Sequence, residues 1–170
     1  GQWDTMMNGF KGASSPVINA VDAPDLSNVT TMAEMFSGAS SVTSSLNAWD
    51  VSHVNNMGAL FYQASSFNGD ISSWDTSNVT TFAGMFSGAI LFNQDIGAWD
   101  TSSVTSMNSM FTNANNFNQD ISAWVVSSTT NMDYMFYNDS AFNQDISAWD
   151  VSHVTSMISM FNGSAFTQAL

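Results

Sequence analysis

The feature that most constrains this chain is a 25-residue repeat marked by phenylalanine and tryptophan. Such an interval is typical of proteins in which copies of one unit stack on each other around a continuous core. We therefore expect one tandem-repeat solenoid over residues 1–170, with no second domain. Its units end at Phe10, Phe36, Phe61, Phe86, Phe111, Phe136 and Phe161.

The two ends of the array depart from the repeat. Phe10 and Phe36 are 26 residues apart, and Pro24 stands where later units have tryptophan. After Phe161 the final unit is truncated. We interpret these as a degenerate first unit and a truncated last one. Two explanations stay open: natural end units, which are atypical in repeat proteins, or a cut within a longer array.

Two hydrophobic spacings alternate within each unit. Phe82, Met85, Phe86 and Ala89 follow the i, i+3, i+4, i+7 pattern of a short helix with one buried face. The later run from Ile96 to Thr101 resembles the strand segment of a leucine-rich repeat. The predicted fold class is an α/β repeat: a leucine-rich-repeat-like solenoid with one short strand and one short helix per 25-residue unit.

The tryptophans are expected to form one column, because they share the period of the repeat. Large aromatic side chains at strand positions are usually core residues, although an exposed column could also act as a platform for stacking sugars. We predict that the column is buried. Its members are Trp49, Trp74, Trp99, Trp124 and Trp149.

The charge of the chain excludes several classes of partner. Lys11 is the single basic residue other than histidine, against 14 acidic residues, and the formal net charge is −13. Binding to nucleic acid or to an anionic membrane surface requires clustered lysine and arginine, so neither is expected. The hydrophobic content of 44% argues against an acidic disordered tail.

The sequence also lacks the signals of membrane insertion and export. It has no run of 18 apolar residues and no charged segment leading into an apolar one. We therefore expect no direct membrane insertion, and we expect the chain to be a mature or excised part of its protein. The absence of cysteine removes disulfides and thiolate metal sites from consideration.

Three motifs recur in order in several units: F-N-x-D-I, W-D-(V/T)-S and V-T-x-M-x-x-M-F. The unit Phe142–Phe161 contains all three, and in them it resembles the BspA-like bacterial surface-protein repeat, a leucine-rich-repeat relative with units of 25 or 26 residues. The resemblance covers residues 10–166. Departures from the pattern lie at Val42, Phe82, Val125 and Thr129.

The resemblance implies a location at the cell surface or outside the cell, and a role in adhesion or protein interaction. It carries over no catalytic residue, and the sequence has no nucleophile, phosphate-loop or zinc-protease motif. We therefore expect a binding module rather than an enzyme. Its expected partner is a host or environmental protein or glycan, and a purely structural spacer is the alternative.

Two columns of aspartate carry most of the acidic charge. The first is expected to form a binding face together with serines two residues later: Asp50, Asp75, Asp100, Asp150, Ser52, Ser77, Ser102 and Ser152. Stacked carboxylates repel each other, so they need a cation, a basic partner, or hydrogen bonds from backbone amides at turns. All three interpretations stay open here. If calcium is the cofactor, its ligands are expected among Asp95, Asp100, Asp120 and Asp145.

A threonine column suggests a second kind of function. Threonine ladders on a flat solenoid face suggest an ice-binding surface, by analogy with other repeat antifreeze proteins. The alternative is that a Ser/Thr/Asn ladder, made of this column and of the residue after each of its members, caps the short helix that follows. The predicted ice face consists of Thr30, Thr80, Thr105, Thr130 and Thr155.

Overall fold

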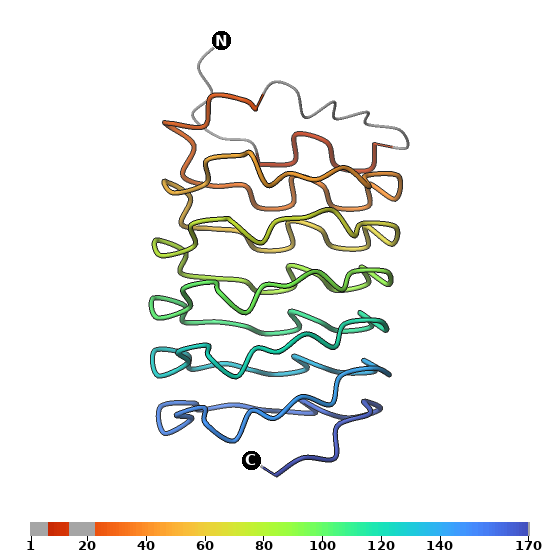
Figure 1. The fold of residues 1–170 in the computed structure, drawn as a ribbon, viewed down its shortest axis with the longest axis vertical. Helices are drawn as coiled ribbons and strands as arrows, with labels where there is room; N and C mark the ends of the chain where they lie inside the picture. The colour runs from red at the N-terminus through yellow and green to blue at the C-terminus, as the bar shows by residue number, and fades with distance from the viewer. Residues whose placement is uncertain (1–6, 14–22, 170) are drawn as a thin grey trace.

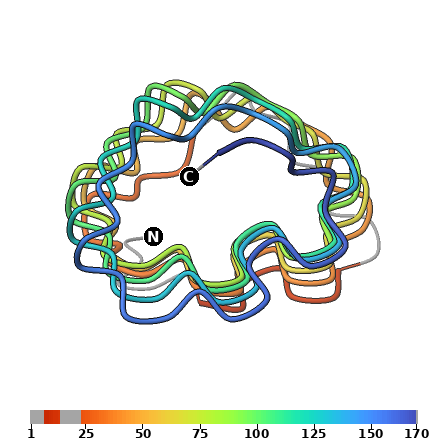
Figure 2. The same ribbon diagram turned by 90° about the horizontal axis from the view of Figure 1, so that it is seen from below.

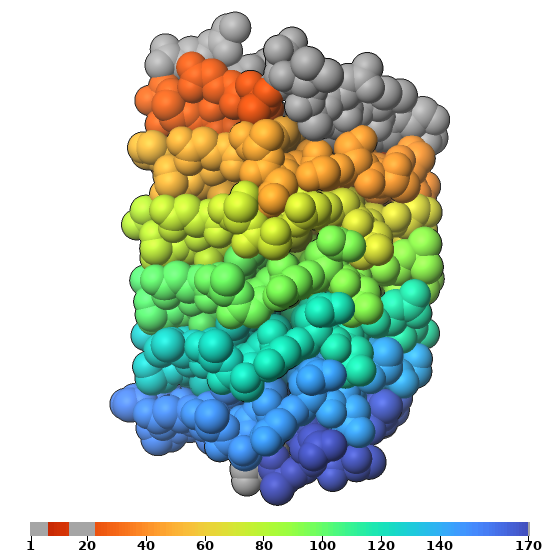
Figure 3. Space-filling model, viewed as in Figure 1, coloured from red at the N-terminus to blue at the C-terminus, as the bar shows by residue number. Residues whose placement is uncertain are grey.

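The chain winds into successive coils that lie one above another (Figure 1). The computed structural model describes residues 7–13 and 23–169. Seen along the stack, the coils follow nearly the same closed outline (Figure 2), and in the space-filling view each coil forms one layer (Figure 3). Main-chain hydrogen bonds such as Phe61 N to Met85 O and Thr105 N to Thr80 O join adjacent coils. Each coil therefore corresponds to one sequence repeat.

The predicted α/β architecture is wrong. Within residues 7–13 and 23–169 the structure has no α-helix and no extended strand. It has only isolated parallel β-bridges, one between each pair of adjacent coils: Thr31 to Asn56, Asn56 to Thr81, Thr81 to Ser106, Ser106 to Asn131, and Asn131 to Ser156. A leucine-rich-repeat arrangement of one strand and one helix per unit is therefore absent from the described part of the chain.

The segment predicted as a helix is a series of turns that bond alternately within and between coils. In the coil that contains Met107, the amide of Met110 donates to the carbonyl of Met107, and that of Ala114 donates to Phe111. The amides of Phe111 and Asn113 point along the stack instead, and Phe111 N donates to Met135 O of the next coil at 2.8 Å. An α-helix would use all these amides within the segment, so it cannot form.

Left-handed backbone conformations also exclude a helix. In the same coil Ser109 has φ 55° and Asn113 has φ 56°, four residues apart. The equivalent positions of the other coils are left-handed as well. An L-residue in this region costs roughly 1 kcal/mol or more relative to a right-handed helix, so the turns persist because the stack fixes them. They nonetheless reproduce the helix-like burial of Met107, Met110, Phe111 and Ala114.

The segment predicted as a strand is likewise a succession of turns. Trp99 N donates to Ile96 O at 3.2 Å, and Val104 N donates to Thr101 O at 3.0 Å. All four side chains are buried, which explains why their apolar spacing suggested a strand. Pairing between coils occurs further on, at Ser106.

Two phenylalanine ladders fill the core. The first runs without interruption through all the coils, with neighbouring ring centroids 5.4–5.7 Å apart and nearly parallel planes: Phe10, Phe36, Phe61, Phe86, Phe111, Phe136 and Phe161. The second lies against it, and within one coil the ring centroids of Phe86 and Phe92 are 3.8 Å apart. Its members are Phe67, Phe92, Phe117, Phe142 and Phe166. Parallel offset stacking adds to the free energy of burial, so the ladders fix the register of successive coils.

The tryptophan column is buried, as predicted, with exposed fractions of 3–7%. Trp74 stacks on Trp99 and Trp124 on Trp149, at centroid distances of 6.2 and 6.4 Å. The indole N–H of Trp99 donates to the carbonyl of Ile71 in the preceding coil at 3.2 Å, and the same bond recurs at Trp74, Trp124 and Trp149. These four indoles thus fill the core and each satisfies a buried carbonyl, whereas the buried indole N–H of Trp49 has no hydrogen-bond partner among the described residues. A sugar platform is not available at this column.

Valine and threonine replace each other in the core, because the threonine hydroxyl finds a carbonyl in an adjacent coil. Thr129 stands in a valine column, is fully buried, and donates to Val104 O at 2.8 Å. Thr101 stands where other units have valine and donates to Val125 O at 2.9 Å. The satisfied hydroxyl accounts for the departure at Thr129 from the repeat pattern.

The left-handed turns make opposite predictions for two alanines of one coil. Ala59 has φ 53°, whereas Ala64 is buried and is not among the left-handed residues. Replacing Ala59 by glycine relieves backbone strain, so we expect Ala59→Gly to leave the free energy of unfolding unchanged or raise it by up to about 1 kcal/mol. The control Ala64→Gly should lower it by about 1 kcal/mol.

Urea denaturation of both variants measures these changes. Within a helix, both substitutions would destabilise by about 1 kcal/mol. Equal losses for Ala59→Gly and Ala64→Gly would therefore contradict the turn structure.

Candidate functional site

The first aspartate column forms a line of turns along one side of the stack. In each turn a carboxylate oxygen accepts the amide of the serine two residues later: Asp50 to Ser52 at 3.1 Å, Asp75 to Ser77 at 3.1 Å, Asp100 to Ser102 at 2.9 Å, and Asp150 to Ser152 at 3.1 Å. The aspartates are exposed, and Val125 interrupts the column with an exposed side chain. The predicted binding face is therefore continuous over Asp50, Asp75 and Asp100, with Asp150 beyond the gap.

Hydrogen bonds from serine stabilise the ionised form of three of these aspartates. The pKa of Asp100 is lowered by the Ser102 hydroxyl and, next, by the Ser102 amide, and the pKa values of Asp50 and Asp150 are lowered in the same way by Ser52 and Ser152. The carboxylates of Asp50, Asp100 and Asp150 therefore remain charged at mildly acidic pH. Lys11, the one lysine of the chain, pairs with Glu34 in the first coils, so it does not neutralise this face.

The second aspartate column has the same local geometry. Asp70, Asp95, Asp120 and Asp145 accept the amides of Ser72, Gly97, Ser122 and Ser147 at 2.9–3.0 Å. The backbone amide and then the hydroxyl of the serine lower the pKa of Asp120 and of Asp145, while the Asp145 charge acts in the opposite direction on Asp120. Turn formation therefore accounts for both columns.

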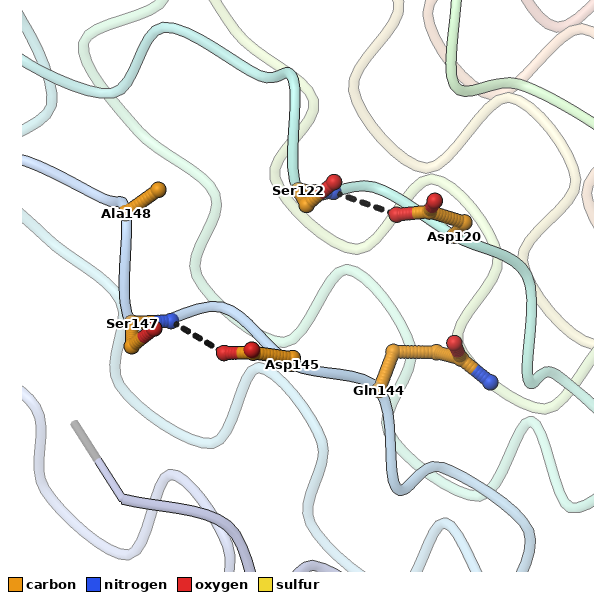
Figure 4. A pocket seen from close by; sticks show the side chains of 6 residues that line it. All are labelled: Asp120, Ser122, Gln144, Asp145, Ser147 and Ala148. Atoms are coloured by element: carbon orange, nitrogen blue, oxygen red, sulfur yellow. Dashed lines mark hydrogen bonds between the residues drawn. The ribbon is translucent and has the colours of Figure 1, made fainter.

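A small surface pocket lies where two of these turns stack. It has a volume of about 180 Å³ and is lined by Asp120, Ser122, Gln144, Asp145, Ser147 and Ala148. Figure 4 shows the two aspartate–serine pairs on adjacent coils, each closed by its own hydrogen bond, with Gln144 beside Asp145. The pocket combines negative charge with hydroxyl and amide groups, a set suited to polar or cationic groups.

The four predicted calcium ligands belong to two different columns. Asp95, Asp120 and Asp145 follow each other at 25-residue intervals in the second column, whereas Asp100 lies in the first column. Among the described residues, no group of three or more histidine, cysteine, aspartate or glutamate side chains is placed to hold a metal ion. Calcium binding stays a prediction of the sequence.

The threonines of the predicted ice face make regular contacts between coils. The hydroxyls of Thr80, Thr105, Thr130 and Thr155 each donate to the carbonyl 25 residues earlier, at 2.9–3.2 Å. Thr30 lies at the start of the same column, where its carbonyl accepts the amide of Asn55. The hydroxyls therefore hold coils together. Ice binding stays a prediction, which thermal hysteresis measurements can check.

The residues that follow this column cap turns, not a helix. Thr81 Oγ1 accepts the amide of Ala83, and Asn131 Oδ1 accepts that of Asp133. The predicted capping role is therefore right in its chemistry, but the capped element is different.

An asparagine–glutamine ladder, which the sequence motifs did not predict, lies beside the second aspartate column. Asn93 Oδ1 accepts the backbone amide of Asn118 at 3.0 Å and the side-chain amide of Gln119 at 2.9 Å. Asn68 and Asn118 serve the coils that follow them in the same way. The signal was present in the F-N-x-D-I motif, where Asn recurs every 25 residues and three units have Gln at the variable position: Gln94, Gln119 and Gln144.

The two roles of Asp100, turn former and surface charge, can be separated by mutation. Asp100→Asn keeps an oxygen that accepts the Ser102 amide, so we expect it to leave the free energy of unfolding nearly unchanged. Asp100→Ala loses this acceptor and should destabilise by about 1 kcal/mol or less, because the group is exposed. Thermal and urea unfolding at pH 7 measure both. A greater loss for Asn than for Ala would contradict the turn assignment.

Comparison with known proteins identifies the family but not an activity. One family model, described as "Mycoplasma protein of unknown function, DUF285", matches residues 4–99 and again residues 72–170. No curated protein and no solved structure matches the chain. In the described residues no helix is long and apolar enough to cross a membrane. Because each family match covers more than half of the sequence, the chain belongs to the DUF285 family.

Proposed function

We propose that this chain is a binding module of a secreted or surface-attached protein, and that the first aspartate–serine column is its contact face. The observation that supports this most is the arrangement of Asp50, Asp75 and Asp100 on consecutive coils, each exposed and each held by a serine amide. Their spacing is that of the coils, so the face presents a row of carboxylates whose backbone positions are fixed.

The charge of this face defines the partner that it favours. A row of carboxylates attracts cationic groups and repels anionic ones. We therefore propose that the partner is a protein segment with lysine or arginine side chains. The serine hydroxyls beside the carboxylates provide further hydrogen-bonding groups, and Ser77 Oγ already donates to Asp75 at 2.7 Å.

The extracellular location belongs to the same proposal. It is supported by the resemblance of the repeat motifs to BspA-like surface-protein repeats. The family match itself gives a domain of unknown function and says nothing about location. The proposal assigns no catalytic role to this face.

Two sets of substitutions with the same change in charge test the contact face. Probing a protein and glycan array with the recombinant chain first selects a partner. We then expect Asp50→Asn, Asp75→Asn, Asp100→Asn and Asp150→Asn together to weaken binding at least about tenfold. The control carries Asp70→Asn, Asp95→Asn, Asp120→Asn and Asp145→Asn, and it should bind nearly as tightly as the natural chain.

Affinities at about 50 and about 200 mM salt measure the electrostatic part of the interaction, which salt screens. Equal losses in the two variants would show a general effect of net charge and contradict a specific face. If no protein or glycan binds, the spacer interpretation replaces the proposal.

A further inference from the structure

The carboxyl group of Asp139 is buried at a position where other coils have alanine. Its exposed fraction is 0%. Going back along the chain in steps of 25 residues, the column reads Ala114, Ala89, Ala64 and Ala39, and all of these are buried. A carboxyl group therefore occupies the space of a methyl group, in one coil of the array.

The hydrogen bonds of Asp139 satisfy only one carboxyl oxygen. Oδ1 accepts the amides of Ala141 at 3.1 Å and of Phe142 at 3.3 Å. Oδ2 is buried and has no hydrogen-bond partner among the described residues. A buried oxygen without a donor is tolerated far better in a neutral carboxyl group than in a carboxylate, because the charge has lost its hydration.

The coil that covers Asp139 is built differently from the others. Phe142 lies six positions after Phe136, but Phe166 lies only five positions after Phe161, so one residue of the repeat is missing there. Phe166 still stacks on Phe142 at 6.1 Å. The amide of Ala165 donates to the main-chain carbonyl of Asp139 at 3.1 Å. Segment 162–169 therefore packs directly over the carboxyl group.

No charged group compensates for a carboxylate at this position. In the preceding coil Ala114 is flanked by Asn113 and Asn115, and segment 162–169 contains no charged residue. Within its own coil the nearest acidic residues are Asp133 and Asp145, six positions away on either side. The hydroxyl of Ser164, which follows in the column, donates to Phe161 O instead.

Burial accordingly raises the pKa of Asp139 from 3.8 to about 7, against the opposing effect of the Ala141 and Phe142 amides. The direction of the pH dependence follows from the proton that the packed state binds. Between pH 3.8 and about 7 the packed state holds a proton that the open state has released, so opening becomes easier as the pH rises through this range. Above about pH 7 both states have lost the proton, and opening no longer becomes easier as the pH rises.

We propose that Asp139 makes the packing of segment 162–169 on the preceding coil depend on a proton. With a neutral carboxyl group the segment closes over Asp139. Loss of the proton to solvent leaves a buried, unpaired carboxylate, which is hydrated only when the segment lifts away. The acidic face described above plays no part in this device, so the two proposals can fail separately.

Hydrogen exchange of the segment tests the device. After correction for the intrinsic dependence of exchange on pH, the protection of the Ala165 amide should fall roughly thirtyfold between about pH 5.5 and about pH 8.5, as linkage predicts for a pKa near 7. Asp139→Ala, which restores the residue of the other coils, and Asp139→Asn, which keeps an acceptor without charge, should both remove this dependence. Asp145→Asn, at an exposed position, should retain it.

Protection in the natural chain that does not change with pH would overturn the proposal, and so would an unchanged dependence in Asp139→Asn. Carboxyl NMR of the natural chain gives a measurement that needs no variant. A titration midpoint for Asp139 near 7 is expected, and a midpoint near 4 would also overturn the proposal.

Discussion

The fold depends on how each coil divides its backbone amides. Along Met107–Ala114, alternate amides donate to the next coil: those of Met107, Ser109, Phe111 and Asn113. The amides of Met110, Thr112 and Ala114 instead close turns within the coil. The turns require left-handed residues, which an isolated chain avoids. Stacking supplies both the hydrogen-bond partners and the phenylalanine contacts that maintain the turns. A single unit therefore has neither a complete set of hydrogen bonds nor a closed core, and stability is a property of the array.

The polar residues of the surface also divide their hydrogen bonds between turns and adjacent coils. Aspartate, asparagine, serine and threonine recur because each closes a turn or reaches the adjacent coil: Asp100 holds the Ser102 amide, Asn93 holds that of Asn118, and Thr105 donates to Thr80. A column that repeats in sequence is thereby explained without a ligand. Function has to be sought where a polar group has more than its structural role, as in the free charge of Asp50, Asp75 and Asp100.

The sequence predicted the repeat, its length and the buried columns, but not the backbone that carries them. Hydrophobic spacing reports which side chains face inward, and turns that bury Met107, Met110, Phe111 and Ala114 give the same spacing as a helix. The left-handed conformation of Ala59, Ser109 and Tyr134 could not be predicted, because these residues do not usually adopt it. The second left-handed position of each coil is glycine or asparagine in most units, and there the sequence did carry a signal: Gly38, Gly88, Asn113, Asn138 and Gly163. The turn role of the aspartates was among the predicted alternatives. The Asn–Gln ladder was missed because its bonds join different units.

Departures from a repeat differ in what they cost the structure. Thr129 in a valine column finds a carbonyl for its hydroxyl, and Val125 in an aspartate column only exposes an aliphatic side chain. Asp139 in an alanine column has no such solution, since one oxygen remains without a donor. The buried indole N–H of Trp49 also lacks a partner within the described part of the chain, but it does not titrate, whereas protonation of Asp139 can change the equilibrium between packed and open states. Because the equivalent position of the other described coils is alanine or serine, a pH dependence of packing can be assigned to Asp139.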